Sequence, residues 1–163
     1  MDEDAPFERC AATFDLPMFV VTAAAGDERD GCLVGFVTQC SIDPPRVLVC
    51  LSKENRTTRI ASAADGLVVH VLRAADRDVA SHFGELTGDE VDKLAGRRWR
   101  PGPVDAPVLE GLDWFAGAVL ERLDLGDHTG FLLEVTGDGS AARADEPGLG
   151  FQAVRDLDPG HPA

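Results

Sequence analysis

Six apolar, β-branched runs at short spacing constrain the fold of this chain more than any other feature of its sequence. They cover residues 17–24, 30–40, 46–51, 66–72, 113–125 and 129–138. Turn residues separate several of them, such as Gly26 and Asp27 between the first two. Short runs joined by hairpin-like turns predict a mainly β chain that folds as a closed or partly closed antiparallel barrel.

Helical signals interrupt the strands in two places. Residues 55–65 predict a short helix, and residues 75–86 place three apolar side chains on one helical face. Residues 87–96 begin with Thr87 and Glu90 at capping-box spacing, which predicts one more helix. The barrel is therefore expected to carry a few short helices.

The remaining segments carry loop signals. Residues 97–111 are rich in Pro and Gly and predict a long surface loop. Residues 156–163 have no periodicity and are expected to fray. With 163 residues in all, we expect one domain over residues 1–163, with its core at about residues 15–137.

Charge and hydropathy exclude some function classes. The formal net charge is −14, and no basic stripe interleaved with aromatic residues offsets it, so we expect no nucleic-acid partner. No run of about 18 apolar residues is present, so we expect no membrane-spanning helix. The first ten residues are acidic and lack the pattern of a signal peptide, which predicts a cytoplasmic protein.

The four cysteines are Cys10, Cys32, Cys40 and Cys50, and no two of them form a C-x-x-C pair. Their spacing does not favour a zinc site or a dithiol motif. Three of them lie in apolar strand-like runs, where cysteine usually acts as a small buried hydrophobic residue. Reduced thiols agree with a cytoplasmic location.

A polar strand end precedes the Asp43-Pro44-Pro45 bend. It consists of Thr38, Gln39, Cys40 and Ser41. Their donors and acceptors suit a flat heterocycle with hydrogen-bonding edges. The alternative is that they are turn residues that satisfy their own backbone.

A cluster of donors and cations follows the next strand, in the segment SKENRTTR. It contains Lys53, Asn55, Arg56, Thr57, Thr58 and Arg59. Because a helix is expected to begin here, its free backbone amides and these side chains suit a phosphate group. The alternative is an ordinary, solvated helix start.

The histidines and glycines exclude several kinds of site. His70 lies within an apolar strand and is expected to be a satisfied core residue, whereas His128 follows a tight turn between two strands. The four histidines do not form the spacing of a metal site, and no G-x-S-x-G elbow, G-x-G-x-x-G turn or P-loop is present. A bound nucleotide or flavin must therefore be held in another way.

Taken together, several ordered segments resemble the flavin reductase-like family. They are DGCLVGFVTQCSIDPPRVLVCLSKENRTTRIA, LVVHVL followed by VASHFG, PVLEG before a strand, and GDHTGFLLEV. The short spacing before the double proline, with SKENRT after the next strand, is similar to the flavoredoxin-type and actinobacterial branch. The resemblance implies an FMN-binding split barrel, a six-stranded antiparallel Greek-key barrel with a few short helices.

The resemblance also implies roles for individual residues. Thr38, Gln39, Cys40 and Ser41 would follow the isoalloxazine ring and the ribityl chain. Lys53, Asn55, Arg56, Thr57 and Thr58 would hold the flavin phosphate, although Arg56 occupies a position that is often aromatic in that branch. His82, Phe83 and Gly84 would close over the site. His128 would help to place the nicotinamide.

The function implied is that of an NAD(P)H-dependent FMN reductase, with FAD or riboflavin as other flavins. NADH or NADPH would donate a hydride, and the reduced flavin would leave or pass electrons to a partner such as a monooxygenase. The family is typically homodimeric. One alternative is an electron carrier that holds FMN without NAD(P)H turnover, and another is a split barrel for a different cofactor, such as haem or a deazaflavin.

Overall fold

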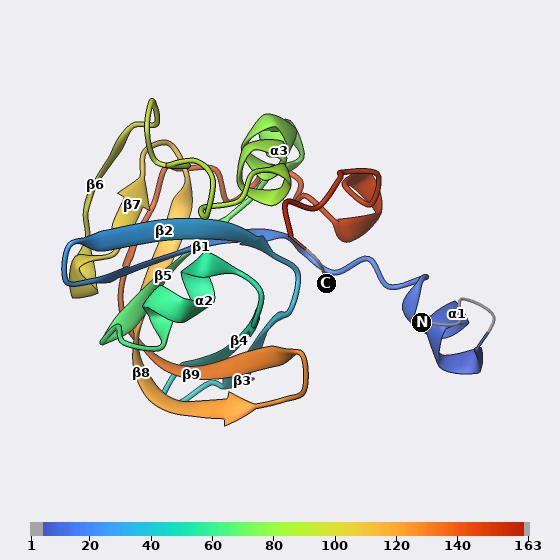
Figure 1. The fold of residues 1–163 in the computed structure, drawn as a ribbon, viewed down its shortest axis with the longest axis horizontal. Helices are drawn as coiled ribbons and strands as arrows, with labels where there is room; N and C mark the ends of the chain where they lie inside the picture. Colours follow the sequence, from blue (N-terminus) through green and yellow to red (C-terminus); the bar gives the residue numbers. More distant parts are fainter. Residues whose placement is uncertain (1–4, 162–163) are drawn as a thin grey trace.

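The computed structural model describes residues 5–161, which form a strongly curled antiparallel sheet with short helices around it (Figure 1). The elements are α1 (Pro6–Ala11), β1 (Phe19–Ala25), β2 (Glu28–Val34), β3 (Val37–Ser41), β4 (Arg46–Ser52), α2 (Arg56–Ala61), β5 (Gly66–Val71), η1 (Ala74–Asp76), α3 (Arg77–Glu85), β6 (Trp99–Pro101), η2 (Pro103–Asp105), β7 (Pro107–Leu109), β8 (Asp113–Asp124), β9 (His128–Gly139) and η3 (Phe151–Ala153). The mainly β prediction is confirmed.

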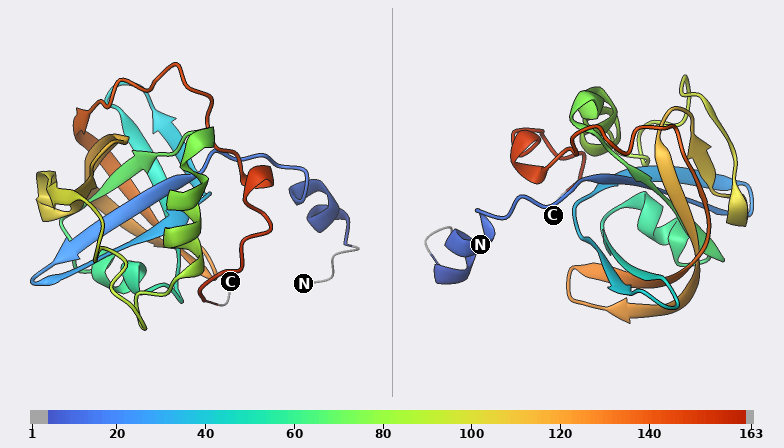
Figure 2. Two further views of the ribbon diagram at one scale, coloured as in Figure 1. Left: turned by 90° about the horizontal axis from the view of Figure 1, so that it is seen from above. Right: turned by 180° about the vertical axis from the view of Figure 1, so that it is seen from behind.

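One sheet contains seven strands in the order β2-β1-β5-β8-β9-β4-β3, and every neighbouring pair is antiparallel. β2 and β3 are consecutive in the chain yet lie at opposite ends of the sheet, so the sheet curls to let residues 35–36 connect them (Figure 2). The Cys50 amide donates to the Phe36 carbonyl oxygen at 2.9 Å. The predicted strand at 30–40 is therefore two strands, and the sheet has seven strands rather than six.

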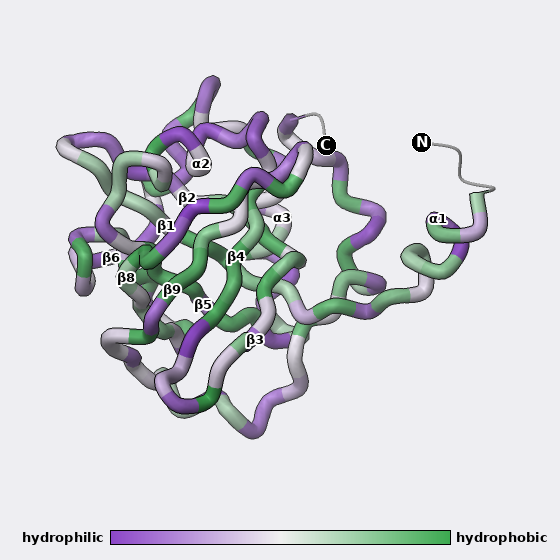
Figure 3. Tube along the Cα trace, turned by 90° about the horizontal axis from the view of Figure 1, so that it is seen from below, coloured by the Kyte–Doolittle hydropathy of each residue, from purple (hydrophilic) through white to green (hydrophobic). Residues whose placement is uncertain are grey.

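The interior of the barrel is filled by alternate residues of its strands. In β4, Val47, Val49 and Leu51 are buried, and they meet the buried Phe131 and Leu133 of β9. Hydrophobic stretches follow the strands in Figure 3, and more hydrophilic stretches follow many connections. α2 packs against β1, β2 and β4 and adds two buried apolar residues to this core. The period-2 pattern of the sequence thus fixes which strand faces point inward.

A second core covers the outer face of β1. Val20 points to this side, where it joins Ala80 and Phe83 of α3 and the buried Leu149 and Val154 of the C-terminal segment. β1 is consequently buried on both faces, which explains its uninterrupted apolar sequence.

The helix predicted for residues 87–96 does not form. These residues adopt separate turns, in which the Thr87 hydroxyl oxygen accepts from the Asp89 amide at 3.3 Å and the Asp92 carboxylate accepts from the Leu94 amide at 3.0 Å. Each bond is of the kind that caps a helix start, and the Thr87 carbonyl oxygen accepts from the Glu90 and Val91 amides at 3.2 and 3.1 Å, but a new turn begins at Asp92 and the first is not continued as a helix. The prediction of a helix over residues 87–96 was therefore wrong.

Two segments expected to be irregular have more structure than predicted. The loop at 97–111 contains the two-stranded β6–β7 sheet and η2. The tail is not frayed over its described residues, because Leu157 packs against the second core and His161 bonds Asn55. Residues 162–163 lie outside the described part of the chain.

The cysteines only partly follow the prediction. Cys32 is buried and Cys50 is half-buried, but Cys40 is exposed because it lies on the edge strand β3. All four thiols are free. None of the helices formed by residues 5–161 has the length and apolar character needed to cross a bilayer.

Candidate functional site

A cavity of about 1050 Å³ lies between the open end of the barrel and the N-terminal arm, which we define as residues 5–16. Its barrel wall includes Cys32, Gly35, Phe36, Cys50, Ser52, Asn55 and His128. Its second wall comes from the two ends of the chain, through Phe7, Phe14, Phe151, Arg155 and His161 among others. A mostly apolar cavity of this size with a few polar groups has the character of a site for a small molecule or cofactor.

Register explains why Cys50, Ser52 and His128 meet at the barrel wall. Ser52 is the last residue of β4 and lies opposite His128, the first residue of β9. Cys50 and Ser52 point to the same side of β4 because side chains alternate along a strand. The cavity therefore opens onto the outer face of β4 and β9.

An aromatic pair borders the cavity at this point. The ring centroids of Phe36 and His128 are 5.2 Å apart, and the planes are inclined by 49°. His128 Nδ1 donates to Asp127 Oδ1 at 2.6 Å, and this hydrogen bond lowers the pKa of the Asp127 carboxyl. Because Nδ1 is engaged, Nε2 is the ring nitrogen that can face a ligand.

Asn55 is the most firmly held polar group in the cavity wall. It is 7% exposed; its Oδ1 accepts from the Thr57 amide at 3.1 Å and its Nδ2 donates to His161 Nε2 at 3.1 Å. The Thr58 hydroxyl donates to the Ser52 carbonyl oxygen at 2.5 Å. The end of β4 and the start of α2 are thus fixed to each other beside the cavity, although α2 itself has only six residues.

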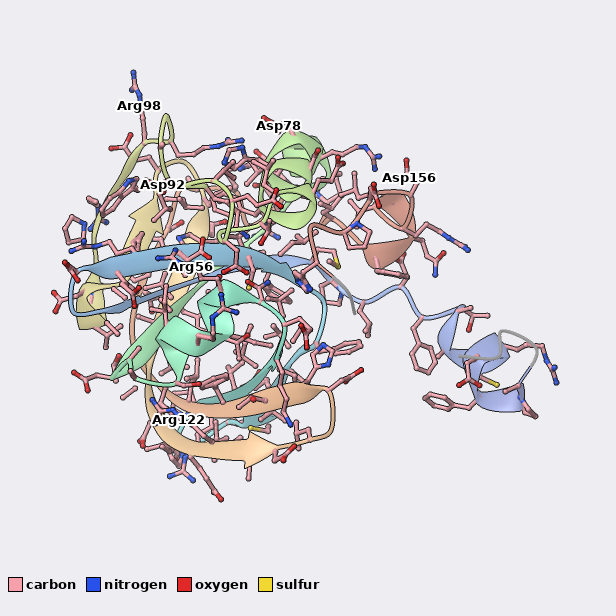
Figure 4. The ribbon with its side chains drawn as sticks, viewed as in Figure 1. Arg56, Asp78, Asp92, Arg98, Arg122 and Asp156 are labelled. Carbon is pink, nitrogen blue, oxygen red and sulfur yellow. The ribbon has the colours of Figure 1, made fainter. Side chains whose placement is uncertain are left out.

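The cations of this segment already have acidic partners. Lys53 Nζ lies 2.6 Å from Asp124 Oδ1 on β8. Arg56 lies between α2 and β2 (Figure 4), with its guanidinium 3.8 Å from both Glu28 and Asp30. Neither cation lines the cavity, so the phosphate cluster predicted from the sequence is not assembled around it in this structure.

Arg9 and Arg155 are the cations in the cavity wall, and sequence reasoning missed both. Arg155 donates to Gln152 Oε1 at 3.1 Å, a contact three residues away within the C-terminal segment. Both arginines come from segments without strong strand or helix periodicity, so no sequence signal marked them as part of the site.

Thr57 lies one layer behind the cavity, at 0% exposure, and its hydroxyl has no hydrogen-bond partner in the described part of the chain. The hydroxyl lies near the Asp30 carboxyl and the Cys32 thiol and lowers the pKa of each, although its geometry makes no hydrogen bond to either. Burial raises the pKa of Cys32 to about 11, so this cavity-wall thiol stays protonated at neutral pH. Burial also raises the pKa of Asp30, against the opposing charge of Lys93.

The four β3 residues are exposed or half-exposed and do not line the cavity. The Thr38 hydroxyl donates to the Gln39 carbonyl oxygen at 3.2 Å, and Gln39 Nε2 donates to the Ser41 carbonyl oxygen at 3.1 Å. These contacts match the alternative in which such residues satisfy their own backbone. Thr38 nevertheless lies opposite Leu48, on the outer face onto which the cavity opens.

The SHFG segment of α3 also lies behind the cavity wall. His82 Nε2 donates to the Lys93 carbonyl oxygen at 2.6 Å, and Phe83 is 1% exposed in the second core. Gly84 packs so closely on Leu33 that an added Cβ would come within 2.8 Å of it. Leu33 lines the cavity, so α3 supports that wall without contributing His82, Phe83 or Gly84 to its surface.

Known proteins resemble this chain in sequence and in fold. The "High molecular weight rubredoxin" of Moorella thermoacetica is 30% identical over 83% of this chain and 60% of its own length. The "Flavin-dependent monooxygenase, reductase subunit HsaB" of Mycobacterium tuberculosis is 36% identical over 61% of this chain and 54% of its own length. The chain thus spans little more than half the length of these curated relatives.

One solved structure is similar to this chain over most of the length of both proteins. The Streptomyces globisporus C-1027 NADH:FAD oxidoreductase SgcE6, in complex with NAD and FAD fragments, has a TM-score of 0.76 and 28% identity. The similarity covers 91% of this chain and 88% of that one. In addition, residues 11–155 match the family described as "Flavin reductase like domain". The chain, a curled antiparallel barrel with a cofactor-sized cavity at its open end, belongs to the flavin reductase-like domain family.

Proposed function

We propose that this protein is an NAD(P)H-dependent flavin reductase that uses FMN and supplies reduced flavin to a monooxygenase. The observation that carries the proposal is the cavity of about 1050 Å³, whose apolar wall carries Ser52, Asn55 and His128. Relatives named as the reductase subunit of a flavin-dependent monooxygenase and as an NADH:FAD oxidoreductase support the same activity.

The residues of the cavity fit a flavin. Its fused ring is flat and mostly apolar, and Phe36, Cys50 and Leu51 offer apolar surface beside it. Ser52 and Asn55 offer hydrogen bonds to the polar edges or to the side chain of the flavin. A bound flavin supplies the acceptor for the hydride that NAD(P)H donates.

The protein would orient the two reactants and exclude water from the hydride transfer. His128, whose Nδ1 bonds Asp127, would have its Nε2 free to help place the nicotinamide. Apolar walls exclude water from the transfer. His128 is not required as a base, because hydride transfer needs no proton abstraction.

The other predicted site residues lie outside the cavity lining. Thr38, Gln39, Cys40 and Ser41 continue the outer sheet face beyond Cys50, where an elongated ligand would extend from the cavity. Lys53 and Arg56 would bind a flavin phosphate only by exchanging their partners Asp124 and Asp30 for it. Thr57, Thr58 and the SHFG segment of α3, His82, Phe83 and Gly84, support the wall.

We also propose that the protein is a homodimer. The outer face of β4, β8 and β9 carries Leu48, Leu120, Leu125 and Leu132, of which Leu120 and Leu125 are 47% and 50% exposed. Leu48 pairs with Leu132 across the strands, so these residues form one apolar surface. A second copy of the chain would remove this surface from water.

The four free thiols support a reducing compartment, and we propose that the protein works in the cytoplasm. The same compartment supplies the nicotinamide cofactor. We propose NADH rather than NADPH as the donor, because a similar solved structure is that of an NADH:FAD oxidoreductase.

Anaerobic mixing of the protein with FMN and NADH tests the activity. We expect the visible absorbance of FMN to bleach with about 1 to 1000 turnovers per second, the usual range for enzymes. His128→Gln should raise the KM for NADH more than it lowers kcat. If neither NADH nor NADPH bleaches the flavin, the reductase proposal is wrong.

The second candidate is an FMN-binding electron carrier, which the similarity to a high molecular weight rubredoxin favours. A carrier should keep its yellow colour through gel filtration and show no turnover with NAD(P)H. A reductase that treats flavin as a substrate should lose the colour and turn over added FMN. The absorption spectrum of the purified protein also separates a flavin from a haem or a deazaflavin.

A further inference from the structure

The lining of the cavity carries more cations than carboxylates, although the chain as a whole is strongly acidic. In the described part of the chain, the cavity is lined by two guanidinium groups, those of Arg9 and Arg155, and by one carboxylate, that of Glu8. The whole chain has a formal charge of −14. Because a chain this acidic repels anions at long range, a site for an anionic ligand needs cations close by. The lining supplies two, and neither belongs to the phosphate segment predicted from the sequence.

Arg155 is presented to the cavity by an anchored stretch of the C-terminal segment. The preceding residue, Val154, is 4% exposed in the second core. The Arg155 guanidinium donates to Gln152 Oε1 at 3.1 Å. Gln152 Nε2 in turn donates to the carbonyl oxygens of Ala12 and Phe14 at 2.9 and 2.8 Å. The reverse orientation of this amide would set Oε1 against those two carbonyl oxygens, so Oε1 is directed to the guanidinium.

The positive charge of Arg155 is not neutralised within the described part of the chain. Its partner Gln152 is uncharged, and no carboxylate of residues 5–161 lies within ion-pair distance of it. The adjacent Asp156 is held by Arg77, whose Nη2 donates to both carboxylate oxygens at 3.0 and 2.9 Å. The Arg155 guanidinium therefore has both charge and donors left for an anion in the cavity.

The two reactants of a flavin reductase both carry phosphate, and their rings must meet face to face for a hydride to pass between them. The barrel wall, with Cys50, Ser52 and Asn55, is the surface that fits the flavin. The nicotinamide dinucleotide must then approach the other face of the flavin ring, from the wall formed by the two ends of the chain. Phe151 and Arg155 belong to that second wall. A cation there meets the dinucleotide.

We propose that Arg155 binds the diphosphate of the nicotinamide dinucleotide. The planar guanidinium fork matches the oxygens of a phosphate group, and charge-assisted hydrogen bonds of this kind are about twice as strong as neutral ones. The diphosphate is common to NADH and NADPH, so Arg155 adds affinity for both without distinguishing them. This inference rests on the reductase activity proposed above and adds the residue that holds the second reactant.

Calorimetric titration with ADP-ribose tests the site directly, because this compound carries the diphosphate but no nicotinamide. The titration is made with and without saturating riboflavin, which carries no phosphate. Arg155→Gln should raise the Kd at least about tenfold, the loss expected for hydrogen bonds to a charged group. Arg155→Lys keeps the charge without the fork and should recover part of the affinity. The Kd of the wild type should also rise more steeply with salt than that of Arg155→Gln.

Arg98→Gln is the matched control. Arg98 is an exposed arginine that points away from the body of the molecule in Figure 4 and does not line the cavity. Its substitution changes the net charge by the same amount, so it measures the effect of overall charge alone. Both variants should unfold at the temperature of the wild type, because Arg155 is exposed as well. An equal loss of ADP-ribose affinity in both variants, or no loss in Arg155→Gln, would contradict the proposal.

Kinetics with different hydride donors separate the phosphates that Arg155 could meet. Arg155→Gln should raise the KM for NADH and for NADPH by the same factor, with a smaller change in kcat. N-benzyl dihydronicotinamide carries no phosphate, so it should reduce FMN equally fast with the wild type and the variant. A loss confined to NADPH would assign Arg155 to the 2′-phosphate, and a loss of affinity for FMN relative to riboflavin would assign it to the flavin phosphate. Either result would overturn the assignment to the diphosphate.

The binding and kinetic results also separate this inference from the reductase activity. Flavin reduction by NADH with an unchanged KM in Arg155→Gln would overturn the inference and leave the reductase activity standing. Binding of ADP-ribose that depends on Arg155, in a protein that turns over neither NADH nor NADPH, would support the diphosphate site and contradict the reductase activity. A wild type that does not bind ADP-ribose, with or without riboflavin, would overturn the inference.

Discussion

Lowering the pH from about 7.5 to about 5 should destabilise this protein through one buried imidazole, that of His70. His70 is 0% exposed in the middle of β5. The Leu109 amide donates to its Nε2 at 2.9 Å, so Nδ1 carries the proton and donates to the Val20 carbonyl oxygen at 2.9 Å. A second proton on Nε2 would face the Leu109 N–H group, so the folded state requires the neutral ring.

The size of the effect follows from the two pKa values. Burial lowers the pKa of His70 from 6.5 to about 4 in the folded state. Between these values the unfolded chain binds more protons than the folded chain, so the free energy of unfolding falls as the pH falls through this window. One pKa unit corresponds to about 1.36 kcal/mol, so the loss at about pH 5 is about 2 kcal/mol.

Urea denaturation of the wild type and of His70→Gln at both pH values measures this loss. Glutamine can accept from the Leu109 amide and donate to the Val20 carbonyl oxygen, but it does not titrate. The wild type should therefore lose about 2 kcal/mol more than His70→Gln between the two pH values. His128→Gln, a change at a half-exposed histidine, serves as the control and should behave like the wild type. If the wild type and His70→Gln lose equal stability, the buried neutral imidazole is not the source and the reasoning fails.

Three further predictions concern the segment beside the cavity. Thr57→Val should leave stability unchanged or raise it by about 1 kcal/mol in thermal unfolding, because the buried hydroxyl has no partner among the described residues; a clear loss would show that the hydroxyl is bonded. Asn55→Asp keeps the cap of α2, since Asp and Asn cap equally well, but should weaken FMN far more than riboflavin in fluorescence titrations, because only FMN carries a phosphate; equal losses would remove the phosphate from this region. Asp124→Asn should release Lys53 and tighten FMN relative to riboflavin about two- to tenfold at low salt, and a preference independent of salt would argue against a role for this cation.

The strands were the most predictable part of the fold, because alternation reports burial directly. Val47, Val49 and Leu51 alternate with half-buried residues, and the structure places all three in the barrel core. The irregular segments were the least predictable. Residues 87–96 carry the signature of a helix start, and Thr87 does begin a turn, but a second turn begins at Asp92 and no helix follows. The local sequence does not determine whether a turn of this kind continues as a helix.

Site residues at strand ends could be predicted from the sequence. Site residues whose positions are set by partners far away in the chain could not. Asn55 and His128 follow or precede strands that pair with each other, and both line the cavity. Lys53 and Arg56 were predicted in the same segment, but their positions are set by carboxylates on other strands. No pattern within the segment reveals those partners, which lie about 25 and 70 residues away in the chain.

The two walls of the cavity differ in solvent exposure, and this difference bears on whether the flavin is kept or released. Cys32 and Leu51 in the barrel wall are 2% and 1% exposed and are fixed by the core, whereas Phe7 in the arm is 71% exposed. Covering the exposed parts of Phe7 and Phe14 is worth roughly 2–4 kcal/mol per arm. That gain is comparable to a change of one to three orders of magnitude, roughly, in an equilibrium constant. A flavin that covers Phe7 and Phe14 would gain part of this free energy, so the arm as well as the barrel wall should determine how tightly the flavin is held.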